Sequence, residues 1–374
     1  MDLVLYRKYR PKTFSGIEGQ EHVVRTLQGA LKLGKIAHAY LFTGPRGTGK
    51  TTIARLLART LNCEKNSRPE AGSQKLEAVS TEPCNRCSIC QEINDGRSMD
   101  LIEIDAASNR GIDEIRNLKE TVRFSPARNK YKIFIIDEVH MLTKEASNAL
   151  LKTLEEPPEH AIFILATTEP HKMLPTIISR VQRFDFKKLT NDQIIAKLKK
   201  ISQKEKISID DDSLGLIARG SEGSLRDAES GLAKLIAFCG PKINVDLVKE
   251  TLGFIPLNFS IQLLDFIGRK QASEAVNLVN QIYNSGLDLE QFTDNLIDYL
   301  RKILIAKTSP AVVVGFSDEL NQDGIKIVSD FAASLESSFI INAINIFVEA
   351  KNQIRISPIP QLPLELAIVK LTSG

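Results

Sequence analysis

The chain has 374 residues, of which 43% are hydrophobic and 25% charged, and its formal net charge is only +3. This length predicts roughly two or three domains, and the near-neutral charge excludes a dedicated nucleic-acid binder, so any DNA contact must come from local patches or from an assembly. The N-terminus lacks the apolar stretch of a signal peptide, and no run of about 18 apolar residues occurs. We therefore expect a soluble, cytoplasmic protein that makes no contact with a membrane.

Four short apolar runs alternate with helical patterns over the first 190 residues. These runs are Ala39–Thr43, Leu101–Asp105, Lys132–Asp137 and Ile162–Thr167. We interpret each run as a nearly all-apolar strand, of the kind that helices cover on both faces. The alternation predicts an α/β fold class, with a parallel sheet flanked by helices.

The pattern becomes helical throughout from about Leu189. Thr190 is a predicted N-cap for a helix through Lys204, and further helices are expected at 211–219, 224–238 and 244–252. Beyond residue 254, apolar side chains recur at three- and four-residue steps. We expect three domains, 1–188, 189–253 and 254–374, and a flexible polar insertion within the first, at 64–83.

A glycine-rich stretch follows the first predicted strand and precedes a helix expected from Thr52 to Leu61. It matches G-x-x-x-x-G-K-[ST] at every fixed position, with Gly44, Pro45, Arg46, Gly47, Thr48, Gly49, Lys50 and Thr51. Glycines let backbone N–H groups turn around phosphate oxygens, and the helix N-terminus adds partial positive charge. Lys50 would reach the β- and γ-phosphates of ATP, and the Thr51 hydroxyl would ligate Mg²⁺. The strand and helix around it disfavour the alternative, a chance glycine-rich turn.

Two adjacent carboxylates end the strand predicted at 132–137. Ligands of open α/β sheets bind at the carboxyl ends of strands, so Asp137 would hold the Mg²⁺ shell and Glu138 would orient and deprotonate the attacking water. The alternative is a solvated strand end. An apolar strand downstream of an intact phosphate loop favours the catalytic interpretation.

Three cysteines, Cys84, Cys87 and Cys90, are spaced by two residues, and Cys63 at the end of the predicted phosphate-loop helix is a plausible fourth ligand. Four thiolates suit tetrahedral Zn²⁺, and a site with four protein ligands leaves no open position, so we expect one structural zinc ion. The alternative is reduced cysteines without metal. Cys239 is more typical of a small core residue.

Three stretches carry a resemblance to a known family: 4–24, 137–186 and 223–230. They resemble the gamma/tau ATPase family of bacterial DNA polymerase III clamp loaders, in the AAA+ superfamily. The resemblance implies an AAA+ ATPase domain with a zinc module at 63–90, a small helical lid at 189–253 and a helical collar at 254–374 that joins subunits. The gap between Cys63 and Cys84 is longer than in the family.

The family places a polar sensor where this chain has Thr167, although many AAA+ proteins use Asn there; the alternative is a buried threonine at a strand end. Ser179–Arg180 matches the first two residues of the family's Ser-Arg-Cys motif, with Val181 in the third place. The resemblance implies that Arg180, rather than Arg183, reaches the γ-phosphate bound by a neighbouring subunit, as arginine fingers do.

The resemblance also implies that Arg226 senses the γ-phosphate from the lid; the alternative is a surface ion pair with a neighbouring acid. The stretch that includes Arg10 and Pro11, with Arg7, Lys8, Gln20 and His22, matches the segment that wraps the adenine in this family. With the phosphate loop and Thr52, these residues form the expected ATP/ADP site. Arg110 and Arg116 are candidate DNA contacts, although either is equally a solvated surface charge.

The resemblance implies a subunit that couples ATP hydrolysis to opening a sliding clamp and loading it onto primer–template DNA. Its partners would be delta, delta-prime and further copies of itself. One alternative is another AAA+ machine such as a branch-migration motor, which the cysteines and the Ser-Arg motif disfavour. The other is a non-hydrolysing scaffold subunit, which the intact Lys50, Thr51, Asp137 and Glu138 disfavour.

Overall fold

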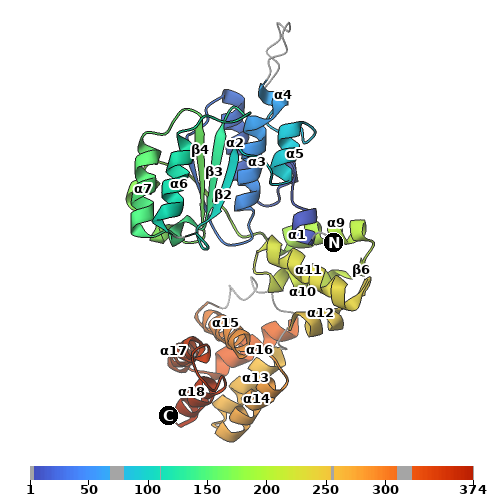
Figure 1. Ribbon diagram of the computed structural model, residues 1–374. Coiled ribbons are helices and arrows are strands. Elements are labelled where there is room, and N and C mark those ends of the chain that lie inside the picture. The colour runs from blue at the N-terminus through green and yellow to red at the C-terminus, as the bar shows by residue number, and fades with distance from the viewer. Residues whose placement is uncertain (1–3, 68–79, 110, 254–256, 310–321, 374) are drawn as a thin grey trace. The chain divides into compact units, whose positions relative to one another are not determined.

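The computed structural model describes residues 4–67, 80–109, 111–253, 257–309 and 322–373 (Figure 1). The candidate DNA contact Arg110 and most of the polar insertion lie outside these ranges. Internal contacts divide the chain into two compact units, residues 1–244 and 245–374. The division into three domains stays a prediction.

Three layers make up the larger part of the first unit, with one parallel sheet between two helical layers (Figure 1). The elements of the unit are α1 (Leu5–Lys8), η1 (Phe14–Gly16), α2 (Glu21–Leu33), β1 (Ala39–Thr43), α3 (Lys50–Asn62), α4 (Glu64–Ser67), α5 (Ser88–Asn94), β2 (Leu101–Asp105), α6 (Ile112–Val122), β3 (Lys132–Asp137), η2 (Val139–Met141), α7 (Lys144–Glu155), β4 (Ala161–Thr167), η3 (Pro170–Lys172), α8 (Pro175–Ile178), β5 (Gln182–Asp185), α9 (Asn191–Glu205), β6 (Ser208–Ile209), α10 (Asp211–Gly220), α11 (Leu225–Cys239) and β7 (Lys242–Ile243).

The five strands of the sheet lie in the order β2-β3-β4-β1-β5, and every pair is parallel. The α/β fold class is thereby confirmed, with the first three strands at their expected bounds and β4 beginning one residue early. β2 corrects one expectation: it is an edge strand with partly exposed side chains rather than a strand buried on both faces. The other edge, β5, was not predicted, because Phe184 is its one buried residue.

Alternate residues of the central strands face opposite layers of helices. On β1, Tyr40 and Phe42 pack into the core that α2 and α3 cover, whereas Ala39 and Leu41 pack into the core that α6 and α7 cover. Side chains of successive strand residues point to opposite faces, which explains this division. Burial on both sides fixes the register, so the carboxyl ends of β1, β3 and β4 stay aligned at one edge.

The remainder of the first unit is a helical bundle of α9, α10 and α11, with a small parallel pairing of β6 and β7. A capping box begins α9, because the Thr190 side chain accepts a hydrogen bond from the Gln193 backbone and the Gln193 side chain accepts one from the Thr190 backbone. This confirms Thr190 as the N-cap. Ser224 caps α11 with a single hydrogen bond, which its side chain accepts from the Asp227 backbone N–H.

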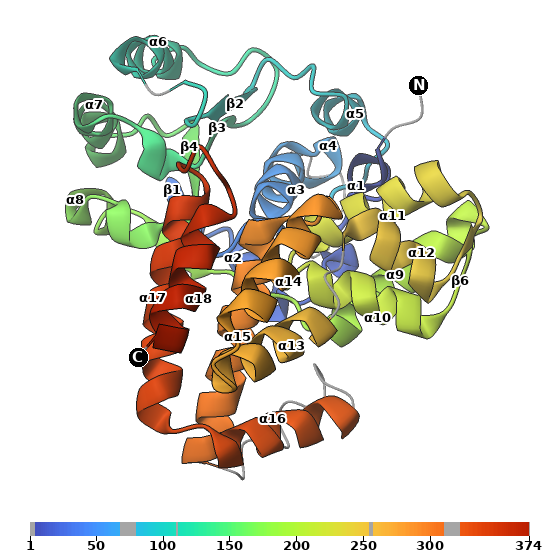
Figure 2. The ribbon, with the colours of Figure 1, turned by 90° about the horizontal axis from the view of Figure 1, so that it is seen from below.

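The described residues of the second unit form only helices, and α17 packs against both α15 and α18 (Figure 2). Its elements are α12 (Val245–Leu252), α13 (Leu257–Gly268), α14 (Ala272–Asn284), α15 (Leu289–Thr308), α16 (Gln322–Ser334), α17 (Ser337–Ile354) and α18 (Leu362–Ser373). Phe292, Leu296, Leu300 and Ile303, which repeat at three- and four-residue steps along α15, are fully buried in its core. The apolar stripe expected from the sequence is thus the inner face of this helix.

Candidate nucleotide-binding and metal-binding sites

The phosphate loop follows β1 and opens α3, which begins at Lys50, two residues earlier than expected. Two glycines are required there. Gly44 has φ +138°, and a Cβ at this position would lie 2.4 Å from the Phe186 carbonyl oxygen; Gly47 has φ +75°, and a Cβ there would lie 1.9 Å from the Ser224 Oγ. Larger side chains at either position would displace the loop from β5 or from α11.

A cavity of about 480 Å³ opens over this loop, a volume within the range of small-molecule sites. Its wall combines the phosphate loop, the carboxyl ends of β2 and β3, the N-terminal segment and the start of α11. The lining residues are Tyr6, Arg10, Pro11, Ile17, Glu18, Arg46, Gly47, Thr48, Gly49, Lys50, Thr51, Thr52, Asp105, Ala107, Asp137, Glu138, Leu189, Leu225, Arg226 and Glu229. Of the phosphate-loop residues, Gly44 and Pro45 do not line it.

Lys50 lies in the cavity wall, and its ammonium donates hydrogen bonds to the carbonyl oxygens of Gly44 at 2.8 Å and of Pro45 at 2.9 Å. Gly44 and Pro45 therefore hold the Lys50 side chain rather than lining the cavity themselves. Burial lowers the pKa of Lys50, and the nearby carboxylates of Glu138 and Asp137 oppose that shift. A cation in this position suits the phosphate chain of a nucleotide.

Thr51 and Asp137 meet across the sheet edge, where the Thr51 Oγ1 donates a hydrogen bond of 2.8 Å to Oδ2 of Asp137. A hydroxyl and a carboxylate at this spacing offer two oxygen ligands for Mg²⁺. Asp105, which sequence reasoning missed, pairs in register with Asp137 and also lines the cavity. Its position at a strand end was the available signal.

Glu138 has the left-handed backbone angle φ +48°. Its Oε2 accepts hydrogen bonds from the backbone N–H of Thr168 at 3.2 Å and from the Thr168 hydroxyl at 2.9 Å. The ring of His140, buried in the wall behind it, lies 3.4 Å from the same oxygen. The carboxylate of Glu138 is thus held from one side, at the edge of the cavity.

Thr167, the expected sensor, is fully buried and does not line the cavity. Its hydroxyl lies 2.9 Å from Nδ1 of His140 and accepts a hydrogen bond of 3.0 Å from the Glu169 backbone. Thr168, the next residue, is the threonine that contacts Glu138. The sensor role of Thr167 stays a prediction.

Arg180 lies outside the cavity, partly exposed in the turn that follows α8. Its guanidinium contacts Glu155 at 2.8 Å and donates to the Thr176 carbonyl at 2.9 Å. Arg183 instead points to Asp185, at 2.7 Å. Neither arginine lines the cavity over this chain's own phosphate loop.

Arg226 and Arg10 bring positive charge to the cavity wall from α11 and from the N-terminal segment. The Arg226 guanidinium lies 5.0 Å from the centre of the Tyr6 ring, a cation–π contact that joins the two segments. Burial lowers the pKa of Arg10. Tyr6 was not predicted, and the sequence offers no specific signal for it.

The other residues of this stretch that were expected to contact adenine, Arg7, Lys8, Gln20 and His22, do not line the cavity. Gln20 is buried and exchanges two hydrogen bonds with the Lys187 backbone, at 2.7 and 3.1 Å. His22 contacts the Asp185 carbonyl oxygen, and Lys8 pairs with Glu205. Of this stretch, the expected adenine contacts therefore narrow to Arg10 and Pro11.

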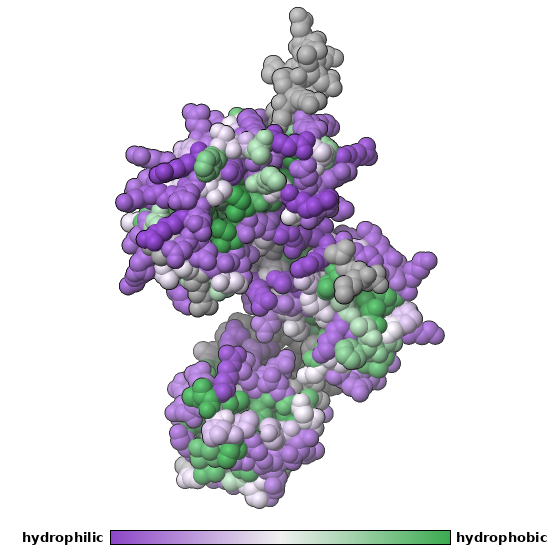
Figure 3. Space-filling view, viewed as in Figure 1, coloured by the Kyte–Doolittle hydropathy of each residue, from purple (hydrophilic) through white to green (hydrophobic). Residues whose placement is uncertain are grey.

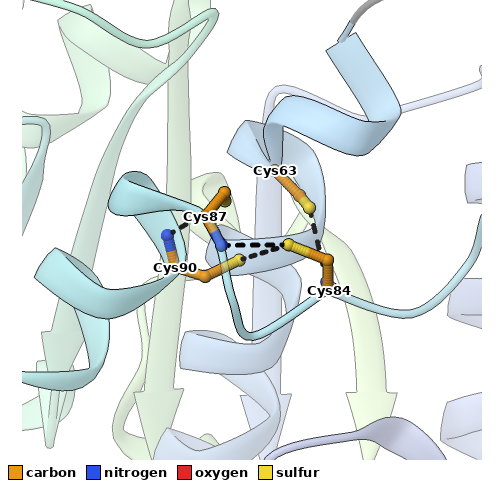
Figure 4. Close-up of side chains that lie close together, drawn as sticks. All are labelled: Cys63, Cys84, Cys87 and Cys90. Atoms are coloured by element: carbon orange, nitrogen blue, oxygen red, sulfur yellow. Dashed lines mark hydrogen bonds between the residues drawn. The ribbon is translucent and has the colours of Figure 1, made fainter.

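The four expected cysteines converge at a second site, between the end of α3 and the start of α5 (Figure 4). The sulfur atoms of Cys63, Cys84, Cys87 and Cys90 all lie within 4.8 Å of one another, and those of Cys84 and Cys90 are 4.0 Å apart. Zinc–sulfur bonds of about 2.3 Å in a tetrahedron place sulfurs about 3.8 Å apart, so the donor set fits this ion.

Backbone N–H groups point at these sulfurs. Cys84 Sγ accepts from the backbone of Cys87 at 3.3 Å and of Arg86 at 3.5 Å. Although burial disfavours the Cys84 thiolate, these hydrogen bonds prevail and lower the pKa of Cys84 to about 6. Burial raises the pKa of Cys63 and of Cys90. Four thiolates this close would repel one another without a cation between them.

The segment that carries these cysteines also binds the N-terminal stretch. The Glu82 carboxylate accepts hydrogen bonds from the backbone N–H groups of Phe14 at 2.7 Å and Ser15 at 2.9 Å. The Asn85 side chain donates to the Lys12 carbonyl at 2.8 Å. The cysteine site is thus joined to the residues that directly follow Arg10 and Pro11.

Comparison with known proteins divides the chain among three family models. Residues 19–190 match a DNA polymerase III delta subunit model, 193–241 a DNA polymerase III clamp loader ATPase lid domain, and 243–374 domain III of DNA polymerase III subunits gamma and tau. The chain is 35% identical to the DNA polymerase III subunit gamma of Buchnera aphidicola (subspecies Acyrthosiphon pisum), with 99% of each chain covered. It belongs to the DNA polymerase III gamma/tau family.

Longer gamma/tau relatives match as well. The Bacillus subtilis tau subunit is 41% identical over 98% of this chain and 62% of its own length, and the Escherichia coli tau subunit 42% over 83% and 46%. The chain thus spans about half to two thirds of these relatives. The solved Thermotoga maritima RuvB Holliday junction branch migration motor is 19% identical, with a TM-score of 0.47 over 69% of this chain and 79% of its own.

No single helix among the described residues has the length and apolar composition needed to cross a bilayer. The bent pair Gly324–Ser334 and Ser337–Ile354 meets that test only when its two helices are counted together.

Proposed function

We propose that this gamma/tau family member is the ATP-hydrolysing subunit of a clamp loader. The observation that carries the proposal is the convergence of Lys50, the Thr51–Asp137 pair and Glu138 on one cavity, at the carboxyl edge of a parallel sheet. Each of these residues offers the chemistry that phosphoryl transfer to water requires.

The chain's own residues divide the work of hydrolysis. Lys50 would move from the carbonyls of its loop to the β- and γ-phosphates, and Thr51 and Asp137 would hold Mg²⁺, which neutralises phosphate charge when bound. Glu138 would take a proton from the attacking water, with its carboxylate aimed by Thr168. Arg226 would contact the γ-phosphate from α11, so that nucleotide state sets the position of the lid.

Arg180 would complete the site of a neighbouring subunit. Its place on the surface, away from the cavity of its own chain, supports a role in trans. In the assembly it would exchange Glu155 for a phosphate oxygen of the neighbour, where it offsets the charge that develops during transfer. An isolated chain would then hydrolyse ATP slowly.

Zinc would be held by Cys63, Cys84, Cys87 and Cys90. The four sulfurs would fill a tetrahedral shell and would leave no open position for a substrate, so the role would be structural. Binding would fix the segment 80–90 against the end of α3.

The second unit would serve as the collar through which subunits assemble. Apolar side chains gather at its surface in Figure 3, and Ile341, Val348, Leu366 and Val369 of α17 and α18 are each at least 43% exposed. The proposed partners are delta, delta-prime and further copies of this chain, together with the sliding clamp and primer–template DNA. Arg116, which pairs with Asp113 on the surface of α6, stays a candidate DNA contact.

The test is ATP turnover by the chain mixed with its partner subunits, with and without clamp and primed DNA. We expect strong stimulation when all components are present. Glu138→Gln should bind ATP normally but hydrolyse it at least about 100-fold more slowly, because general-base catalysis contributes roughly that much or more. Exposed Glu159→Gln is the matched control. Undiminished turnover by Glu138→Gln, or no response to clamp and DNA, would contradict the proposal.

A further inference from the structure

Glu229 is a buried carboxyl in the cavity wall that neither the family motifs nor the hydrolytic chemistry uses. It lies on α11 with only 5% of its surface exposed, and it lines the cavity. Among the residues that the structure describes, none donates a hydrogen bond to it. The carboxyl opens onto the cavity, and a largely buried carboxyl that has no protein donor costs free energy, so this position suits a partner that arrives with the ligand.

The surroundings of Glu229 do not supply that partner. Burial raises the pKa of Glu229 to about 7. Two cations, Lys197 of α9 and Arg10 of the N-terminal segment, lower this pKa but do not offset the effect of burial. Tyr6 and Glu18 share the same cavity wall. The carboxyl thus faces a cavity that has charge nearby but no donor within bonding distance.

The position of Glu229 along α11 identifies the part of the nucleotide that it faces. The helix begins beside the phosphate loop, since a Cβ on Gly47 would overlap Ser224 Oγ. Glu229 follows Ser224 by five residues, which is about 7.5 Å further along the axis. A carboxylate beside the phosphates would repel them, whereas the nucleoside half of a nucleotide carries N–H and O–H donors.

We propose that Glu229 is a specificity-determining residue that accepts a hydrogen bond from the nucleoside half of the bound nucleotide. The donors available there are the 6-amino group of adenine and the two ribose hydroxyls. This inference rests on the proposed ATP site and adds to it the group that reads the nucleoside. It assigns to α11 two tasks, with Arg226 facing the phosphates and Glu229 the nucleoside.

The experiment measures the dissociation constants of ADP, IDP and 2′,3′-dideoxy-ADP with Mg²⁺ by calorimetric titration of the full chain. IDP has a carbonyl in place of the 6-amino group, and the dideoxy nucleotide lacks both hydroxyls. Wild type should bind ADP about 10–100-fold more tightly than the analogue that lacks the donor, since hydrogen bonds to charged groups contribute about 1.5–3 kcal/mol. Glu229→Leu should bind ADP and that analogue equally.

Glu229→Gln keeps a carbonyl acceptor and should retain part of the preference for ADP. This variant replaces Glu229→Leu in the test if the leucine variant does not fold. Asp227→Asn, an exposed carboxyl on the same helix, should leave all three constants unchanged. Equal binding of the three nucleotides by wild type, or an undiminished preference in Glu229→Leu, would overturn the assignment while leaving the ATP site intact. No binding of any of them would overturn the site itself, and the assignment with it.

Discussion

The Thr168 hydroxyl donates a hydrogen bond of 2.9 Å to Oε2 of Glu138, and the Thr168 backbone N–H donates to the same oxygen. A carboxylate that is to accept a proton from a water molecule in a fixed position gains from being held in one orientation. Thr168 comes directly after β4 and Glu138 directly after β3, and these strands pair in register. The sheet thus brings the proposed base, Glu138, and the residue that holds its carboxylate to one edge.

We expect Thr168→Val to lower kcat roughly tenfold with little change in KM, because valine keeps the backbone donor and loses the hydroxyl. Steady-state ATP turnover in the assembled loader measures both constants. Thr26→Val, which removes an exposed hydroxyl on α2, is the control. A rise in KM at constant kcat would instead assign Thr168 to substrate binding.

Arg180→Ala should leave the affinity for ATP unchanged and lower clamp- and DNA-stimulated hydrolysis roughly 1,000-fold, as expected of an arginine that acts on a neighbour's nucleotide. Arg183→Ala is a matched control, because Arg183 pairs with Asp185 of its own chain. Nucleotide affinity by titration and stimulated turnover separate the two variants. Equal losses in both would show that surface charge, rather than Arg180 itself, matters.

Metal analysis of the purified chain should find one zinc ion. Cys84→Ser should abolish it and lower the Tm by about 5–10 °C, because a structural site of four thiolates contributes several kcal/mol to folding. Cys239→Ser, at the end of α11, should keep the metal and the Tm. Full metal content in Cys84→Ser would contradict the ligand set.

Glu229 should make the stability of the nucleotide-free chain depend on pH. Its pKa rises from an ordinary value of 4.5 to about 7 on folding, so the folded state holds a proton that the unfolded state releases between these values. The stabilisation is full below pH 4.5 and lost as the pH rises through 7, in total about 3 kcal/mol. Relative to Glu229→Leu, wild type should lose stability between pH 5 and pH 8 in urea titrations. Parallel curves for the two proteins would rule this out.

The phosphate loop, four strands and the cysteine cluster could be predicted because each is a local pattern. Lys50 and Thr51 have a fixed spacing, β3 is an apolar run, and Cys84, Cys87 and Cys90 recur at regular steps. Each of these signals depends on fewer than ten residues of the chain, whereas Cys63 joins the cluster from 21 residues before Cys84. The structure confirms the fold that they indicate.

The rest of the cavity wall could not be predicted, because it depends on which segments meet in three dimensions. Tyr6 and Asp105 reach the cavity from segments about a hundred residues apart. Whether Thr167 or Thr168 contacts Glu138 depends on which side of the end of β4 each side chain occupies. Glu229 did leave a signal: it lies among Ala228, Leu232 and Leu235 on the buried stripe of α11, where a carboxyl is unusual.

The hydrogen bonds that join Glu82 and Asn85 to residues 12–15 have a consequence for the oxidised protein. Oxidising the thiols, or removing the metal that they would hold, would free the segment that anchors this short stretch. The stretch directly follows Arg10 and Pro11. Oxidation of the cysteine sulfurs would therefore first weaken the binding of nucleotide, while the central sheet remains folded. A chain exposed to peroxide would therefore lose affinity for nucleotide before it unfolds.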